Sequence, residues 1–215
     1  MDLYNYYRST SSYRVRIALG LKNIAYNNLS VHLVQDGGQH NKPEYLALNP
    51  QGRVPCLKTD QGDILIQSPA IIEYLEEAYP TPALLPQDPI ARAQVRSVAA
   101  LIGCDIQPLH NMAVLNRLRS LNIAEADVNA WLAHWIGNGL QAVEALIGDE
   151  GFCFGEPGLA DVYLIPQLYA AHRFGVDISA LPRIQRVERL AQDHPAFTQA
   201  YPDIQPDAPA QANQK

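Results

Sequence analysis

Hydrophobic and polar positions in the first part of the chain follow strand and helix periods in turn. Residues 3–7 are aromatic and β-prone, and the helical pattern that follows places Val15, Ala18 and Leu19 on one face. Residues 25–33 again match a strand. The chain therefore opens in the order β-α-β, which favours a parallel strand pair joined by a crossover helix.

A hairpin pattern and a second helix come next. Residues 55–59 and 64–66 match short strands, and the polar turn between them predicts antiparallel neighbours. Ser68 supplies a hydroxyl suited to the N-cap, and Pro69 suits the first helical position. The order β-α-β-loop-β-β-α predicts an α/β thioredoxin-like domain over residues 1–80.

The second part of the chain carries almost purely helical periodicity. Closely spaced prolines break both helix and strand at residues 81–88, which we interpret as an interdomain linker. An all-α domain is expected over 89–201, and polar residues rich in Pro and Gln predict an extended tail at 202–215. The predicted helices span residues 89–120, 126–148, 159–175 and 183–193.

Composition narrows the classes of function. A hydrophobic content of 47% is ordinary for a packed globular protein, and the net charge of −6 argues against nucleic acid or an anionic membrane as the main partner. The first residues carry no signal-peptide or membrane-span pattern, so we expect a cytoplasmic protein. Cys56, Cys104 and Cys153 are widely spaced, which predicts reduced thiols and no metal site.

Two helix starts are candidates for ligand binding. Ser9 to Ser12 lie between the first strand and the first helix, where free N–H groups and the positive end of the helix dipole stabilise an anion such as a thiolate. Gln67 and Ser68 stand at the second helix start and could receive a carboxylate. Ordinary helix capping explains each cluster equally well when it is taken alone.

Val54 and Pro55 form a third candidate. Proline is tolerated at the start of a strand, and a cis bond there would turn the Val54 backbone toward an extended ligand.

The ordered set of these motifs resembles the zeta class of glutathione transferases, the family that includes maleylacetoacetate isomerases. The resemblance spans nearly the whole chain. It rests on Tyr13-Arg14-Val15-Arg16-Ile17-Ala18-Leu19, Asp36-Gly37-Gly38, Leu48-Asn49-Pro50, Val54-Pro55, Gln67-Ser68, Ala70-Ile71-Ile72-Glu73-Tyr74-Leu75-Glu76-Glu77, Pro80-Thr81-Pro82, Leu84-Leu85-Pro86, Ile106-Gln107-Pro108-Leu109, Ala160-Asp161 and Arg173-Phe174.

The resemblance implies a homodimer whose thioredoxin-like domain binds glutathione and whose helical domain forms most of the second-substrate pocket. Ser9 matches the first serine of the family's Ser-Ser-Cys turn and would hydrogen-bond the glutathione sulfur, and Thr10 matches the second serine. Ser11 stands where many members have cysteine. Any mechanism that needs a protein thiol at this turn is therefore untenable here, and the reactive sulfur must come from glutathione.

The resemblance also assigns the remaining contacts to glutathione. Val54 would bind its cysteinyl backbone, and Gln67 and Ser68 its γ-glutamyl carboxylate. Further matching positions contact glutathione or shape the pocket, namely His40, Gln107 and Asn111. His110 departs from the glutamine that some members have and receives no role.

The implied substrate is a small cis-enoic dicarboxylate, which requires cations near the sulfur. Arg8 and Arg173 are the candidates, although each also suits a surface cation near a helix end. The implied activity is glutathione-dependent isomerisation of maleylacetoacetate to fumarylacetoacetate in phenylalanine and tyrosine catabolism.

Alternative functions remain open at this point. The closest are isomerisation of maleylpyruvate and glutathione transfer to small α-halo acids. A member of a different class, a non-catalytic interaction module with the same fold, predicts loss of the sulfur-binding hydroxyl, whereas Ser9 is present.

Overall fold

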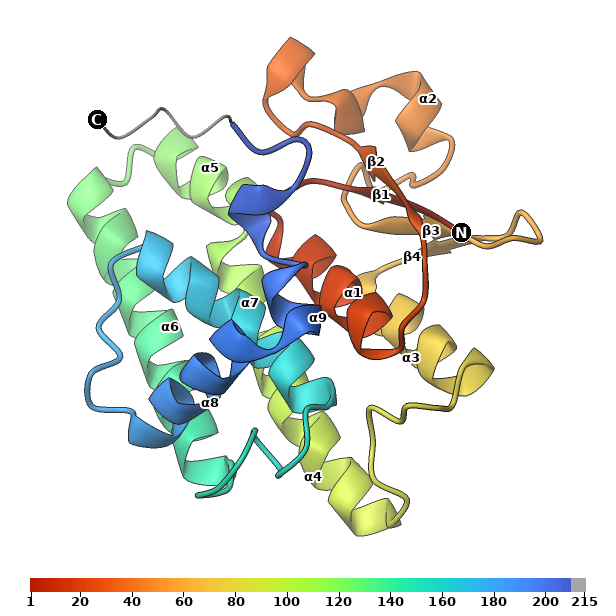
Figure 1. Cartoon of the computed structure of the whole chain (residues 1–215). Helices are drawn as coiled ribbons and strands as arrows, with labels where there is room; N and C mark the ends of the chain where they lie inside the picture. Colours follow the sequence, from red (N-terminus) through yellow and green to blue (C-terminus); the bar gives the residue numbers. More distant parts are fainter. Residues whose placement is uncertain (210–215) are drawn as a thin grey trace, which may run out of the picture. The chain divides into compact units, whose positions relative to one another are not determined.

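The computed structural model describes residues 1–209, and their contacts separate into two compact units. The first contains Met1–Pro82 together with residues 195–209, and the second is Ala83–His194 (Figure 1). The first unit has the predicted thioredoxin-like architecture and the second is built from helices, so the predicted fold class is confirmed. The part of the expected tail at 210–215 lies outside the described residues.

A four-stranded mixed sheet forms the centre of the first unit. Its spatial order is β2-β1-β3-β4, with β1 parallel to β2 and β3 antiparallel to β4, as the β-α-β and hairpin patterns predict. The β1 and β3 strands are also antiparallel, a pairing that those patterns do not predict. Leu3 in β1 is opposite Leu57 of β3 and is fully buried. The strands are β1 (Asp2–Asn5), β2 (Asn27–Ser30), β3 (Cys56–Lys58) and β4 (Ile64–Ile66).

The strand β1 ends earlier than its aromatic pattern predicts. Tyr6 and Tyr7 were expected inside it, but their carbonyl groups instead accept hydrogen bonds from the Arg16 guanidinium, at 3.5 Å and 2.9 Å. A side chain has therefore replaced a neighbouring strand as the hydrogen-bond partner of this backbone.

Helices α1 (Thr10–Leu21) and α3 (Ser68–Ala78) pack against each other within the first unit. The predicted apolar face of α1 is buried, but so are Arg14 and Arg16, at 2% and 1% exposure. This helix is thus enclosed almost all round. The connection from β2 to β3 contains the short helices η1 (Gln35–Gly37), η2 (Gln39–Asn41) and α2 (Pro43–Leu46).

The segment after His194 belongs to the first unit, although the sequence pattern had assigned residues 195–201 to the helical domain. It contains α9 (Pro195–Thr198) and the turn η5 (Pro202–Ile204), and α9 packs on α1, as the blue and red ribbons of Figure 1 show. A Cβ atom on Gly20 would lie 3.2 Å from Ala196, so glycine permits this close approach.

The second unit is a set of packed helices. The predicted helix 89–120 is interrupted in its middle by a π-helical segment, Leu101–Ile106, and a 3-10 helix, Gln107–His110. Pro108 lies in the 3-10 helix, and because it has no N–H it cannot continue the hydrogen bonds of an α-helix. The elements are α4 (Pro89–Ala100), η3 (Leu101–Ile106), η4 (Gln107–His110), α5 (Met112–Ser120), α6 (Glu125–Leu146), α7 (Leu159–Arg173) and α8 (Pro182–Asp193).

One stretch of this unit, Pro89–Ser120, is long and apolar enough to meet a simple membrane-span criterion, with a mean hydropathy of 1.3 over its best window. Core helices of globular proteins meet the same criterion. Within the second unit α4 packs against α7, and η3 packs against α6. The stretch leaves Ile90 and Met112 exposed, and its buried apolar residues include Val95, Val98, Ala99, Ile102 and Ile106.

The N-cap of α7 is Gly158, although serine and threonine are better capping residues. A Cβ atom on Gly158 would lie 2.8 Å from the Leu84 carbonyl oxygen. The Asp161 carboxylate compensates by accepting hydrogen bonds from the N–H groups of Gly158 and Cys153, both at 2.9 Å. The helix start is thus capped from its third residue.

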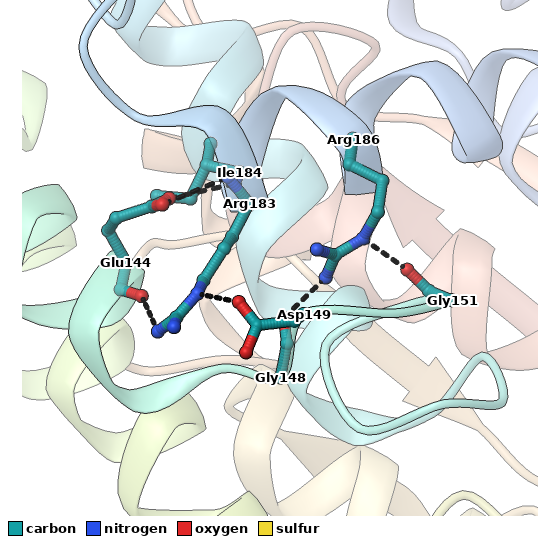
Figure 2. Close-up of polar contacts among 7 residues, drawn as sticks. All are labelled: Glu144, Gly148, Asp149, Gly151, Arg183, Ile184 and Arg186. Atoms are coloured by element: carbon teal, nitrogen blue, oxygen red, sulfur yellow. Dashed lines mark hydrogen bonds and ion pairs between the residues drawn. The ribbon is translucent and has the colours of Figure 1, made fainter.

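The start of α8 is held by a carboxylate from α6. Figure 2 shows Glu144, whose side-chain oxygens accept hydrogen bonds from the N–H groups of Arg183 and Ile184, both at 2.9 Å. Arg183 Nε reaches Asp149 at 2.6 Å, and Arg186 donates to the carbonyl groups of Gly148 and Gly151. These contacts fix the loop after α6 against α8.

Candidate functional site

The turn before α1 is shaped by Ser9. Its backbone is extended (φ −69°, ψ 118°), and its Oγ accepts a hydrogen bond from the Ser12 N–H at 3.2 Å, which makes Ser9 the N-cap. The Ser9 N–H donates to the Tyr6 carbonyl at 3.0 Å. Since the hydroxyl accepts in this contact, its own proton remains available for donation to a ligand.

The electrostatics of this turn favour an anion. The first turn of α1 contains no acidic residue, so nothing within it offsets the positive end of the helix dipole. Arg8 directly precedes Ser9 and is half-buried, and its Cζ lies 6.0 Å from the centre of the Tyr7 ring. Thr10 is buried at 8% exposure and Ser11 is partly exposed, so the two hydroxyls differ in their access to a ligand.

The aromatic pair beside the turn is tightly packed. The Tyr6 and Tyr7 rings meet edge to face with their centres 4.7 Å apart. Burial, together with the neighbouring Tyr7 hydroxyl, raises the pKa of Tyr6 to about 12, while the charge of Arg8 opposes this rise. Tyr6 is therefore a neutral phenol at physiological pH and cannot act as a base there.

Two side chains fix the backbone directly before Val54. The Val54–Pro55 bond is cis, the form whose consequence for the Val54 backbone was considered from the sequence. The Arg53 carbonyl, one residue earlier, accepts hydrogen bonds from Tyr45 Oη and Asn49 Nδ2, both at 2.6 Å. Val54 is 9% exposed and packs in one apolar cluster with Tyr6 and Tyr7. This cluster joins the Val54 backbone to the residues that precede Ser9.

Tyr45 and Asn49 were not assigned a role from the sequence. Asn49 was part of the Leu48-Asn49-Pro50 motif, so its position had been singled out. An asparagine before a proline is a turn signal, and here its side chain also accepts from the Gln51 N–H at 3.1 Å. That local signal does not reveal the contact to Arg53.

Gln67, rather than Ser68, is the N-cap of α3, which corrects the predicted helix start by one residue. Gln67 has a φ of 70°, an uncommon backbone for a residue with a side chain. Its Nε2 donates to Gln51 Oε1 at 2.6 Å. Ser68 enters the helix as its first residue, and no side chain of the described residues caps α3. The first N–H groups of α3 are therefore available to a carboxylate.

His40 lies in η2, within the loop between β2 and β3. Its Nδ1 is buried and has no hydrogen-bond partner among residues 1–209, and burial lowers the pKa of the ring. Gly38 permits this placement, because its φ is 90° and a Cβ atom there would lie 2.5 Å from His40 Cε1. Burial thus favours the neutral ring, whose Nδ1 is an unused polar atom.

The other predicted site residues belong to the second unit. Gln107 is in η4 and is partly buried, and Asn111 is the N-cap of α5, where its Oδ1 accepts from Ala113 N at 2.9 Å. Arg173 ends α7 and is exposed, with its Cζ 4.4 Å from the Phe174 ring centre. His110 is buried, and its Nε2 lies 2.9 Å from Gln167 Oε1. That buried contact is structural.

The first unit thus offers features that fit glutathione. A hydroxyl and a positive helix end at Ser9 suit a thiolate, and the uncapped start of α3 suits a carboxylate. The buried and unpartnered Nδ1 of His40 is a further polar group in the loop before β3. Among residues 1–209 no group of three His, Cys, Asp or Glu residues could hold a metal ion, and the three cysteines are free.

Comparisons with known proteins agree with this fold. The family model of the glutathione S-transferase N-terminal domain matches residues 3–83. A protein of Pseudomonas aeruginosa named maleylacetoacetate isomerase is 66% identical over 211 residues, which cover 98% of this chain and all of that protein. These matches define the chain as a glutathione S-transferase.

Solved structures narrow the class. A maleylpyruvate isomerase described as a bacterial zeta-class glutathione S-transferase is 47% identical, with a TM-score of 0.92, over 97% of this chain and all of that one. A maleylacetoacetate isomerase of Methylobacterium extorquens with bound malonate and glutathione is 37% identical, with a TM-score of 0.90, over 98% of this chain and all of that one. The chain belongs to the zeta class of the glutathione S-transferase family, together with the maleylacetoacetate isomerases.

Proposed function

We propose that this protein is a glutathione-dependent isomerase that converts maleylacetoacetate to fumarylacetoacetate. The observation that carries the proposal is the 66% identity, over 98% of this chain and all of the other, to the Pseudomonas aeruginosa protein of that name. The presence of Ser9 at the N-cap of α1 agrees with it, because the hydroxyl that the reaction needs is retained.

Glutathione, when bound, would supply a thiolate that adds to the cis double bond, whose π electron pair moves onto the conjugated carbonyl group; the remaining single bond can then rotate, and return of the electron pair expels the thiolate. In this proposal the Ser9 hydroxyl donates a hydrogen bond to the sulfur, and the N-terminus of α1 with Thr10 and Ser11 favours the ionised form. Both effects lower the pKa of the thiol. Glutathione is regenerated, and no protein thiol is required.

The remaining residues bind and orient the two ligands. The Val54 backbone receives the cysteinyl part of glutathione, and Gln67 and Ser68 at the start of α3 receive its γ-glutamyl carboxylate. His40, Gln107 and Asn111 complete the contacts. Arg8 and Arg173 bind the carboxylates of a small dicarboxylate substrate, which orients the double bond.

Maleylpyruvate is the second candidate substrate, and the similarity to a maleylpyruvate isomerase structure at 47% identity supports it. Steady-state rates with maleylacetoacetate and maleylpyruvate, measured side by side with and without glutathione, test the proposal. We expect a higher kcat/KM for maleylacetoacetate and no turnover of either substrate without glutathione. A higher value for maleylpyruvate would reverse the assignment, and conjugation of α-halo acids without isomerisation would replace it.

We further propose a cytoplasmic homodimer, on the basis of the family resemblance. We also propose that the helical second unit supplies most of the residues that bind the second substrate, as the family resemblance implies. Light scattering after size-exclusion chromatography measures the mass in solution. A mass of one chain at micromolar concentration would contradict the dimer.

A further inference from the structure

The C-terminal segment of the described chain contacts the backbone that leads into the Ser9 turn. We propose that Asp207 is a positioning residue: its carboxylate holds the Tyr7 peptide and thereby fixes the Ser9 hydroxyl where the glutathione sulfur is activated. This inference rests on the proposed function, because it assigns the residue that supports its central group. The sequence pattern had placed Asp207 in an extended tail without a role.

The contact itself is a hydrogen bond between distant parts of one unit. The Tyr7 N–H donates to Asp207 Oδ2 at 2.9 Å, across 200 residues of sequence. β1 ends at Asn5, so this N–H has no strand partner in the sheet. Asp207 Oδ1 is buried without a hydrogen-bond partner among the described residues, so the bond from Tyr7 is the one hydrogen bond that this carboxylate accepts within residues 1–209. Hydrogen bonds to a charged acceptor are stronger than neutral ones.

Arg16 holds the same backbone segment through separate hydrogen bonds. Its Nη2 donates to the Tyr7 carbonyl and its Nη1 donates to Asn5 Oδ1, both at 2.9 Å. Its Nε donates to the Ala200 carbonyl at 3.0 Å. The side chain is 1% exposed. Both backbone polar groups of Tyr7, its N–H and its carbonyl, are therefore hydrogen-bonded to charged side chains. Tyr7 lies two residues before Ser9.

The segment that carries Asp207 is itself fixed within the first unit. Gln205 Nε2 donates to the carbonyl groups of Gln199 and Tyr201, at 3.0 Å and 2.9 Å. Its Oε1 accepts from Asn28 Nδ2 on β2 at 3.1 Å. Ala208 packs against the cluster that contains Tyr6, Tyr7 and Val54. Asp207 thus approaches Tyr7 from a rigid support.

The position of Ser9 depends on this arrangement because few bonds separate it from Tyr7. The Ser9 N–H is bonded to the Tyr6 carbonyl at 3.0 Å, so a shift of the Tyr6–Tyr7 backbone moves Ser9 and the intervening Arg8 together. Hydrogen bonds weaken steeply with misalignment, and small misplacements of reacting groups lower rates strongly. Loss of the Asp207 contact should therefore act on catalysis more than on glutathione affinity.

Three variants test the inference. Asp207→Ala removes the acceptor, Asp207→Asn keeps an oxygen that can accept from Tyr7, and Ile204→Ala is a matched control at an exposed position of the same segment. The pKa of bound glutathione is read from thiolate absorbance against pH, and kcat is measured beside the glutathione Kd. Hydrogen exchange of residues 4–13 is measured on the ligand-free protein.

In Asp207→Ala we expect faster exchange at Tyr7 and the Ser9 turn, a higher thiol pKa and a kcat lowered by about tenfold, with a Kd changed by less than about threefold. Asp207→Asn should stay within about twofold of the wild type, and Ile204→Ala should match it. An unchanged thiol pKa and kcat in Asp207→Ala would overturn the positioning role, even if exchange rises. Failure of the proposed function is seen separately, as a wild-type protein that does not isomerise substrate, and the exchange experiment still tests the contact.

Discussion

Lys22 and Glu76 form an ion pair inside the first unit, with 2.7 Å between Nζ and Oε2 and no solvent exposure of the lysine side chain. The same Nζ donates to the carbonyl groups of Tyr79 and Pro82, at 2.6 Å and 2.9 Å. The pair therefore connects the end of α1 with α3 and with the chain that follows α3. A buried cation of this kind depends on its partners.

Removal of Glu76 should destabilise the first unit strongly. Glu76→Ala leaves the Lys22 charge buried, and we expect a loss of about 3–5 kcal/mol in the free energy of unfolding. Urea unfolding at pH 7 measures it. Glu77→Ala, at an exposed position of the same helix, should change the stability by less than about 0.5 kcal/mol. Equal effects of the two substitutions would contradict the importance of the buried pair.

Ser9 is expected to have a structural and a chemical role that two variants can separate. Ser9→Ala removes the cap of α1, which should cost about 1 kcal/mol of stability. It also removes the proposed donor to the sulfur, so the pKa of bound glutathione should rise and kcat should fall by about 10- to 100-fold. Ser9→Thr keeps the hydroxyl and should retain most of both properties. Wild-type turnover in Ser9→Ala would remove the chemical role.

Arg8 and Arg173 should matter for the substrate and not for glutathione. A lost charge-assisted contact to a carboxylate predicts a kcat/KM lowered by about tenfold or more in Arg8→Ala and in Arg173→Ala. The glutathione Kd from calorimetry should stay near the wild-type value. Arg189→Ala, which removes an exposed cation of α8, is the control. If neither arginine variant changes kcat/KM, our account of dicarboxylate binding is wrong.

His40 predicts a specific pH dependence of stability. Burial lowers the pKa of its ring in the folded protein, so the unfolded chain binds more protons between that pKa and the ordinary value. With respect to His40, the free energy of unfolding is therefore highest above about pH 6.5, and it decreases as the pH falls toward the pKa of the folded protein. Urea unfolding at pH 7.5 and 5.5 should show a smaller pH effect in His40→Gln than in the wild type. The exposed His134→Gln should leave that effect unchanged.

The contacts at the start of α8 should differ in strength. Glu144 binds two backbone N–H groups, so Glu144→Ala should cost about 1–2 kcal/mol, as loss of a helix cap does. Asp149 makes an ion pair with 77% of its own side chain exposed, so Asp149→Ala should cost less than about 1 kcal/mol. Thermal or urea unfolding compares the two. The reverse order would mean that the ion pair, and not the cap, holds α8.

Local sequence signals predicted much of the fold and the first part of the site. The hydroxyl at Ser9, the helix beyond it and the two short strands at residues 55–59 and 64–66 were recognised because each depends on neighbouring residues. The sequence places the N-cap of α3 at Ser68, one residue later than the observed Gln67, because a positive φ has no sequence signature when the residue is not glycine. Pro108 inside the predicted helix 89–120 was an available signal for its interruption.

Long-range contacts were beyond such signals. The four residues of α9 are too few to show a helical period, and the apolar Ala196 and Phe197 do not by themselves indicate which core they enter. The bond from Tyr7 to Asp207 joins residues 200 positions apart, and neither residue has an unusual neighbourhood in sequence. Pairings of this kind follow from the packed structure rather than from periodicity or capping residues.

The grouping of residues 195–209 with Met1–Pro82 has a consequence for how the protein is made. Translation proceeds from the N-terminus, so the ribosome completes all of Ala83–His194 before it adds α9 and Asp207. The second unit can gain its own contacts while the first still lacks its last helix. A nascent chain arrested before Pro195 should therefore carry the sheet and Ser9 but not the backbone support of the turn. On this view, the protein acquires its ability to activate the glutathione sulfur only at the end of synthesis.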